Sequence, residues 1–146
     1  MSSQKAGLTF EKDLAADIHN NTDALVVFGG GMSGNVRIPQ PDLLIVTDGI
    51  THAIEVKRSS RDRFYIEYGD FLQLEEVRAD DRWLLHKFTN REVVMWHIDD
   101  IPPTEFEPHT TIDSSLRIDK PDTDVWPSAQ SGKDAWEIVT ETLSLS

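Results

Sequence analysis

The chain has 146 residues, no cysteine and a formal net charge of −12 at pH 7. This length suits one domain with a real hydrophobic core, and the lack of cysteine excludes disulfides, thiolate nucleophiles and cysteine-based zinc sites. No stretch approaches the roughly 18 apolar residues that a membrane-spanning helix needs, and there is no signal-peptide core, so we expect a soluble cytoplasmic protein.

The negative charge is concentrated in the last third of the chain. Residues 99–146 contain 3 Lys/Arg against 11 Asp/Glu, whereas residues 1–98 contain 11 against 15. Such acidity is unusual for a protein that binds nucleic acid, which normally needs a basic surface. A salt-rich cytoplasm would screen the charges and predicts a halophilic protein. An ordinary acidic protein with a solvated tail explains the composition equally well.

Hydrophobic spacing predicts a series of helices and strands before residue 101. Phe10, Leu14 and Ile18 recur every four residues, which predicts a helix. The apolar run at 24–28 predicts a buried strand. The expected elements are a helix at 9–20, a strand at 24–28, a loop at 29–41, a hairpin at 42–57, a basic loop at 58–63, a helix at 66–77, and strands at 83–88 and 92–98. This α-β-β-β-α-β-β order predicts an α/β fold in which helices flank a mixed central β-sheet.

The sequence changes character beyond residue 101. An acidic, proline-spotted stretch follows, and a hydrophobic period returns only at 133–144, where a short amphipathic helix is expected. We therefore expect a main domain at 1–101 and an acidic C-terminal extension at 102–146. The helix would dock on its own domain or on a partner.

Two apolar runs flank Asp48-Gly49, a strong signal for a two-residue β-hairpin turn. The numbers of paired residues would then sum to 97, which places Asp42 opposite Glu55 with Cβ atoms roughly 5 Å apart. Lys57 lies two residues beyond Glu55 and points to the same face. Facing carboxylates repel each other, and burying them without a partner is costly.

A divalent cation would offset this repulsion. Oxygen ligands held close together suit Mg²⁺, with Mn²⁺ as a substitute, and such an ion can activate water for attack on phosphorus. The alternative is that Glu55 and Lys57 are merely neighbouring charges on an exposed face, which the apolar residues around them disfavour. The histidines show no metal-ligand spacing, and we expect His52 to be packed and hydrogen-bonded on the apolar face of the hairpin.

The glycine-rich loop at 29–34 formally matches the dinucleotide-binding pattern G-x-G-x-x-G. A strand rather than a helix follows it, which argues against that kind of site. Consecutive glycines also let backbone N–H groups approach a phosphate, so we expect this loop to contact substrate. A nucleophilic serine is not favoured, because the near match to G-x-S-x-G ends in Asn35. The residues expected to contact substrate in this loop are Gly31, Ser33 and Gly34.

A basic patch follows the carboxylate strand directly. Its position favours contact with phosphate over a merely solvated loop, and a nearby tyrosine could stack on a base or simply pack. The residues concerned are Lys57, Arg58, Arg61, Arg63 and Tyr65.

Pro41-Asp42, the hairpin and Glu55-Val56-Lys57 together resemble the PD-(D/E)xK superfamily of nucleases, which has the restriction endonuclease-like fold. Leu8-Thr9-Phe10-Glu11 resembles the first-helix motif whose glutamate completes the metal site. Met32-Ser33-Gly34 stands in the place of a serine-containing glycine loop. Over residues 7–98 the chain is similar to archaeal-type Holliday junction resolvases, which are homodimeric endonucleases for four-way DNA junctions.

The resemblance implies that Glu11, Asp42 and Glu55 hold Mg²⁺, with the Val56 carbonyl as a further ligand. Lys57 would position or activate the attacking water, and the loop that carries Ser33 would contact the scissile strand. The implied substrate is branched DNA, not a small molecule or a membrane. The implied setting is DNA recombination and repair at the nucleoid. On charge alone, we expect the source to be a salt-loving archaeon or one of its viruses.

Two alternatives remain open at this point. A restriction-like or repair endonuclease would keep the fold and the chemistry but act on duplex or flapped DNA. A non-catalytic acidic module could instead mimic DNA and bind a basic partner. The intact set of Glu11, Asp42, Glu55 and Lys57 argues against this second alternative, because drift would be expected to lose at least one of them.

Overall fold

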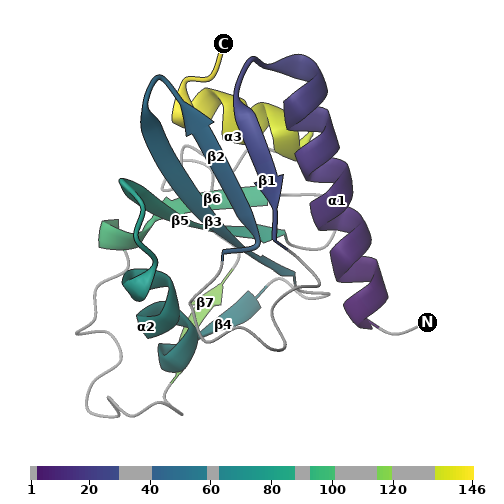
Figure 1. The fold of residues 1–146 in the computed structure, drawn as a ribbon. Coiled ribbons are helices and arrows are strands. Elements are labelled where there is room, and N and C mark those ends of the chain that lie inside the picture. The colour runs from purple at the N-terminus through teal and green to yellow at the C-terminus, as the bar shows by residue number, and fades with distance from the viewer. Residues whose placement is uncertain (1–2, 30–40, 59–62, 88–92, 101–114, 120–133) are drawn as a thin grey trace.

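The computed structural model describes residues 3–29, 41–58, 63–87, 93–100, 115–119 and 134–146, with only the backbone of 3–9, 63–68 and 115–119 (Figure 1). The helices are α1 (Ser3–Asn21), α2 (Tyr68–Glu76) and α3 (Ala135–Leu143), with a 3-10 turn, η2, at Ile98–Asp100. The strands are β1 (Leu25–Phe28), β2 (Leu43–Thr47), β3 (Ile50–Arg58), β4 (Arg63–Glu67), β5 (Asp81–Lys87), β6 (Val93–His97) and β7 (Ser115–Asp119). None of the described helices is long and apolar enough to cross a membrane.

Five strands form the central sheet in the order β1-β2-β3-β5-β6. β3 and β5 are parallel, and the other neighbouring pairs are antiparallel. The predicted α/β fold with a mixed sheet is therefore confirmed. β4 and β7 form a separate antiparallel ribbon that the sequence did not predict, because it joins segments far apart in the chain. The expected basic loop is also shorter, since β3 extends to Arg58 and β4 begins at Arg63.

The hairpin of β2 and β3 has the register that its turn predicts. Asp48 and Gly49 both have positive φ angles, 51° and 77°, as a type I′ turn requires. The ladder pairs Leu43 with Ile54, so the numbers of paired residues sum to 97 as expected. A turn of two residues thus fixes the position of every side chain along both strands.

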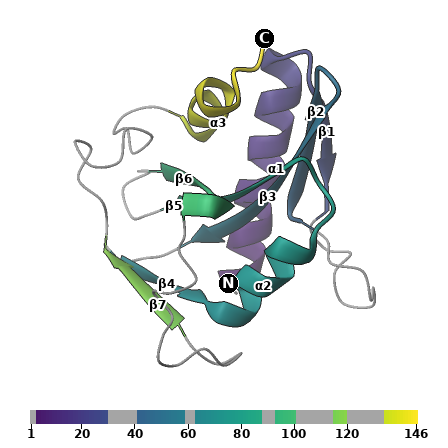
Figure 2. The same ribbon diagram turned by 90° about the vertical axis from the view of Figure 1, so that its left-hand side faces the viewer.

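α1 and α3 cover one face of the sheet and α2 lies on the other side (Figures 1 and 2). The first face carries the main hydrophobic core, to which both helices and every central strand contribute. Its most deeply buried members are Ile18, Leu43, Ile45, Ile54, Leu85, Val93, Ile138 and Val139. On the side of α2, Phe71 and Leu74 are buried.

β1 is an edge strand with one open face, so the expectation of a buried strand at 24–28 is wrong. Val26 and Phe28 pack against the core, whereas Leu25 and Val27 are 61% and 46% exposed. A continuous apolar run cannot by itself distinguish a strand covered on both faces from an edge strand covered on one. The tertiary position of β1 decides between them.

α3 confirms the helix expected at 133–144 and packs on its own domain. Asp134 caps its N-terminus through a capping box with Glu137. Ile138 and Val139 are buried in the core against α1 and β6. Because β7 also pairs with β4, both described elements beyond residue 102 contact elements that precede it.

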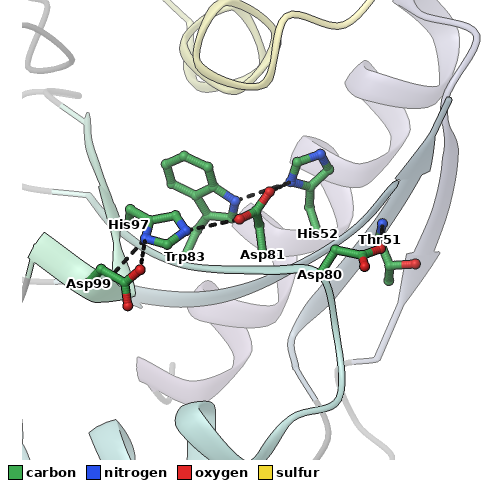
Figure 3. A network of polar contacts seen from close by, with 7 residues as sticks. All are labelled: Thr51, His52, Asp80, Asp81, Trp83, His97 and Asp99. Carbon is green, nitrogen blue, oxygen red and sulfur yellow. Dashed lines mark hydrogen bonds and ion pairs between the residues drawn. The ribbon is translucent and has the colours of Figure 1, made fainter. Parts of the chain in front are cut away.

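A polar network ties the beginnings of β3 and β5 to the end of β6 (Figure 3). Asp81 lies between two histidines, 3.0 Å from His97 Nε2 and 3.8 Å from His52 Nδ1. Trp83 Nε1–H donates to His52 Nδ1 at 3.2 Å, which makes this nitrogen the acceptor of a neutral imidazole. Burial lowers the pKa of His52 in spite of Asp81, in agreement with that state. The expected packed and hydrogen-bonded histidine is confirmed.

Candidate functional site

Asp42 and Glu55 are neighbours at the open end of the hairpin, away from its turn. Asp42 immediately precedes β2, and the pairing of Leu43 with Ile54 places it opposite Glu55, as the register predicts. Asp42 Oδ2 accepts the backbone N–H of Val56 at 2.9 Å. This hydrogen bond ties the aspartate carboxylate to β3.

Gly29 fixes the backbone around Asp42. Its N–H donates to the Asp42 carbonyl at 2.8 Å. A Cβ at position 29 would collide with the Pro41 carbonyl oxygen, so the two backbones approach this closely only because residue 29 is glycine. No sequence pattern marks this role, because Gly29 is one of several consecutive glycines.

Burial is the main cause that raises the pKa of Glu55, to about 8. The charge of Asp42 and a hydrogen bond between the two carboxyl groups act in the same direction, while Lys57 opposes them. Two acids in one half-buried corner cannot both ionise cheaply. The pair therefore favours a bound proton or a nearby cation.

Glu11 brings a third acid from α1. Burial, and after it the charge of Asp42, raise its pKa to about 7 against the opposing charges of Lys57 and Arg58. Glu11 thus shares its electrostatic surroundings with the hairpin acids, although it lies on a different element. Phe10, its neighbour in the chain, packs against the core and helps to hold α1 in place.

Lys57 forms ion pairs with two carboxylates. Its Nζ donates to Asp70 Oδ2 at 2.9 Å and lies 3.8 Å from Glu55 Oε1. Burial lowers the pKa of Lys57, but the hydrogen bond and charge of Asp70, together with the charges of Glu55 and Asp42, outweigh it and leave the pKa raised. Asp70 lies in the first turn of α2. The sequence analysis missed it, because an acidic residue there is also an ordinary way to stabilise a helix.

The donor set fits a divalent metal ion in its chemistry. Carboxylate oxygens are the ligands that Mg²⁺ and Mn²⁺ prefer, and a cation would stabilise the charged forms that burial disfavours. Within the described part of the chain, no three histidine, aspartate or glutamate side chains converge closely enough to hold an ion as they stand. Binding would require the carboxylates to turn toward a common point.

The other expected site residues are only partly described. Gly31, Ser33, Gly34 and Arg61 lie outside the described residues. Arg63 and Tyr65 belong to β4, of which the backbone alone is described, and Arg58 is exposed at the end of β3. The structure therefore brings Asp42, Glu55 and Lys57 together with Glu11 nearby, and leaves the DNA contacts as predictions.

Comparison with known proteins places the chain in a family. The family model "Archaeal holliday junction resolvase (hjc)" matches residues 2–121, which is most of the chain. No curated protein matches it. A 1.6 Å structure of Archaeoglobus fulgidus Hjc, a Holliday junction resolvase from an archaeal hyperthermophile, superposes with a TM-score of 0.61 at 17% identity, covering 95% of this chain and 96% of that chain. At that identity the likeness shows the shared fold. On the strength of the family match, the chain belongs to the archaeal Holliday junction resolvases and is a junction-resolving nuclease.

Proposed function

We propose that this nuclease cuts four-way junctions with Mg²⁺ held by Glu11, Asp42 and Glu55, and by the Val56 carbonyl. Nucleases of the family depend on divalent metal ions, and an all-oxygen donor set favours Mg²⁺, with Mn²⁺ as a substitute. The observation that carries the proposal is the meeting of Asp42 and Glu55 across the hairpin, with Lys57 Nζ 3.8 Å from Glu55 Oε1; burial and the charge of Asp42 there raise the pKa of Glu55. Acids that repel each other in a half-buried corner gain stability from a cation.

Lys57 is the catalytic cation that the protein itself supplies. A metal ion bound nearby would lower the pKa of a coordinated water and neutralise charge on the phosphate. Lys57 would orient the attacking water and stabilise the charge that develops on the phosphate. The loop containing Ser33 would hold the scissile strand. The proposed DNA contacts are Gly31, Ser33, Gly34, Arg58, Arg61, Arg63 and Tyr65.

We also propose that the protein acts as a homodimer. Resolution of a four-way junction needs two symmetric cuts, and a two-fold dimer would place one site on each of the two strands. Sedimentation equilibrium of the protein with and without a junction would measure the number of chains, with two expected in the complex. A single chain per junction would contradict the dimer and leave the site assignment intact.

Cleavage of a labelled four-way junction in Mg²⁺ tests the substrate and the metal. The junction should be cut in Mg²⁺ and left intact in excess chelator, and its component duplex arms should be cut much more slowly. The reaction should be followed from low to high salt, since an acidic protein adapted to salt would show activity at the upper end. Equal cleavage of duplex arms would favour the restriction-like or repair alternative instead.

Two isosteric substitutions test the metal ligands. Asp42→Asn and Glu55→Gln each remove one ligand charge and also the repulsion between the acids, so each should lower the cleavage rate by more than about 100-fold while the fold is kept. Circular dichroism and thermal unfolding would confirm the fold. Asp17→Asn, an exposed position of α1, is the matched control and should cut at the wild-type rate. Wild-type cleavage by either ligand variant would show that the metal site is misassigned.

A further inference from the structure

We infer that Asp70 is a positioning residue for Lys57: the first turn of α2 holds the catalytic ammonium group in place. The inference rests on the role proposed above for Lys57 and adds a residue that neither the motif nor the family match identifies. It comes from one contact, between Lys57 Nζ and Asp70 Oδ2, which are 2.9 Å apart.

The contact joins two elements that no local sequence pattern connects. Lys57 is near the end of β3, and Asp70 lies beyond β4 in α2. The next residue along α2, Phe71, is only 5% exposed, which anchors the first turn of the helix against the protein. The side chains of Lys57 and Asp70 are themselves about one third exposed, at 35% and 36%. Asp70 is thus a partly exposed charged residue, and the packing of the neighbouring Phe71 fixes its position.

The two carboxylates near Lys57 have different proposed roles. Within the described residues, Glu55 Oε1 and Asp70 Oδ2 are the carboxylate oxygens paired with Lys57 Nζ, at 3.8 and 2.9 Å. Glu55 is a proposed metal ligand, so an ion would draw its charge away from the lysine. Asp70 has no place in the proposed ligand set and can hold the ammonium throughout.

Lysine needs such an anchor more than other catalytic residues do. Its ammonium is a point charge on a flexible stem with three donors and no fixed direction. One N–H given to Asp70 restricts the stem and leaves two for the water and the phosphate. Displacement of a catalytic group by about 1 Å can lower the rate around 100-fold. A lysine that is held in place should therefore support faster cleavage than a mobile one.

Single-turnover cleavage by Asp70→Asn tests the inference. The variant keeps the size of the side chain and removes its charge, so the cleavage rate should fall by about 10- to 100-fold. Junction affinity should stay equal or become tighter, because one negative charge near the DNA has gone. Asp70→Glu, which restores the carboxylate, should recover part of the lost rate.

Controls separate the possible failures. Glu76→Gln removes the same charge from an exposed position of α2 and should leave the cleavage rate unchanged. A merely structural Asp70 would weaken binding, folding and rate together, with no recovery in Asp70→Glu. If Lys57→Ala is inactive while Asp70→Asn cuts at the wild-type rate, the positioning role is wrong and the proposed function stands. If Lys57→Ala itself cuts normally, the role proposed for the lysine fails first.

Discussion

At the scale of single residues, the site depends as much on backbone contacts as on charged side chains. Asp42 is held twice, through its carbonyl by the Gly29 N–H and through its carboxylate by the Val56 N–H. Neither contact involves a residue with reactive chemistry. A residue without a side chain can therefore decide the position of a proposed metal ligand.

Gly29→Ala should impair cleavage, although neither glycine nor alanine has a reactive side chain. The new Cβ meets the Pro41 carbonyl oxygen, so the backbone of Pro41 and Asp42 must move away. We expect a loss of about 1 to 3 kcal/mol of stability and a fall in cleavage rate of more than about 10-fold, because Asp42 is displaced. Thermal unfolding and single-turnover cleavage below the unfolding transition measure the two effects.

Gly49→Ala is the matched control for that substitution. Gly49 has a φ of 77° and nothing within 4 Å of an added Cβ, so its cost is conformational and lies at the far end of the hairpin. It should lower stability by about 1 kcal/mol and leave the cleavage rate of the folded protein unchanged. Equal rates for wild type and Gly29→Ala would show that Asp42 is not held in this way.

At the scale of elements, what could be predicted from the sequence is what neighbouring residues decide. The register of the hairpin follows from its two turn residues, so the meeting of Asp42 with Glu55 could be derived without the fold. Glu11 lies on another element, and only resemblance to a family pointed to it. Asp70 could not be found, because its contact with Lys57 depends on how β4 and α2 return to the sheet.

The same limit explains why β4 and β7 were not predicted to pair and why β1 was expected to be buried. β4 pairs with β7 across a long stretch of chain, and although β7 alternates polar and apolar residues, that local pattern does not say which strand it pairs with. β1 was expected to be buried because its run of apolar residues is continuous, yet Leu25 and Val27 face outward. Pairing between distant segments and the position of a sheet edge are tertiary facts that a local pattern does not contain.

α3 gives a prediction in which two changes on one helix act in opposite directions. Ile138 is 2% exposed in the core, so Ile138→Ala should cost about 3 kcal/mol. Ser144 ends the helix with a left-handed φ of 54°, so Ser144→Gly should stabilise the protein by about 0.5 to 1 kcal/mol. Urea unfolding of the full chain measures both. An unchanged stability in Ile138→Ala would mean that α3 is not part of the cooperative core.

At the scale of the whole molecule, the main feature is the net charge of −12. Most of that excess comes from residues 99–146, which lie largely outside the described part of the chain. Adaptation to high salt therefore stays a prediction from composition. The described acids and histidines, however, already give the fold a definite pH dependence.

Glu55 and His86 lie on the same side of the sheet and change the free energy of unfolding with pH in opposite directions. Glu55 has a pKa of about 8 in the folded protein and an ordinary one of 4.5, so between these values the folded state holds a proton that the unfolded state lacks. The free energy of unfolding therefore falls as pH rises through that range. Burial, with a smaller effect of Lys57, lowers the pKa of His86 to about 3, so His86 makes the free energy of unfolding fall as pH drops below 6.5.

Glu55→Gln isolates the contribution of Glu55 to the pH dependence of the free energy of unfolding. The amide resembles the protonated acid and does not titrate, so in chelator the variant should gain on wild type as pH rises from 5 to 8. The gain should reach at most about 1.4 kcal/mol per pH unit, the value for one proton. Urea unfolding at each pH measures it, with Glu76→Gln, at an exposed position of α2, as the control for the loss of one acidic side chain. In saturating Mg²⁺ the wild type should instead be more stable than Glu55→Gln, because the wild type gains metal-binding energy that the variant loses. A difference between Glu55→Gln and wild type that stays constant from pH 5 to 8 would contradict the raised pKa, and with it one of the observations that support the metal site.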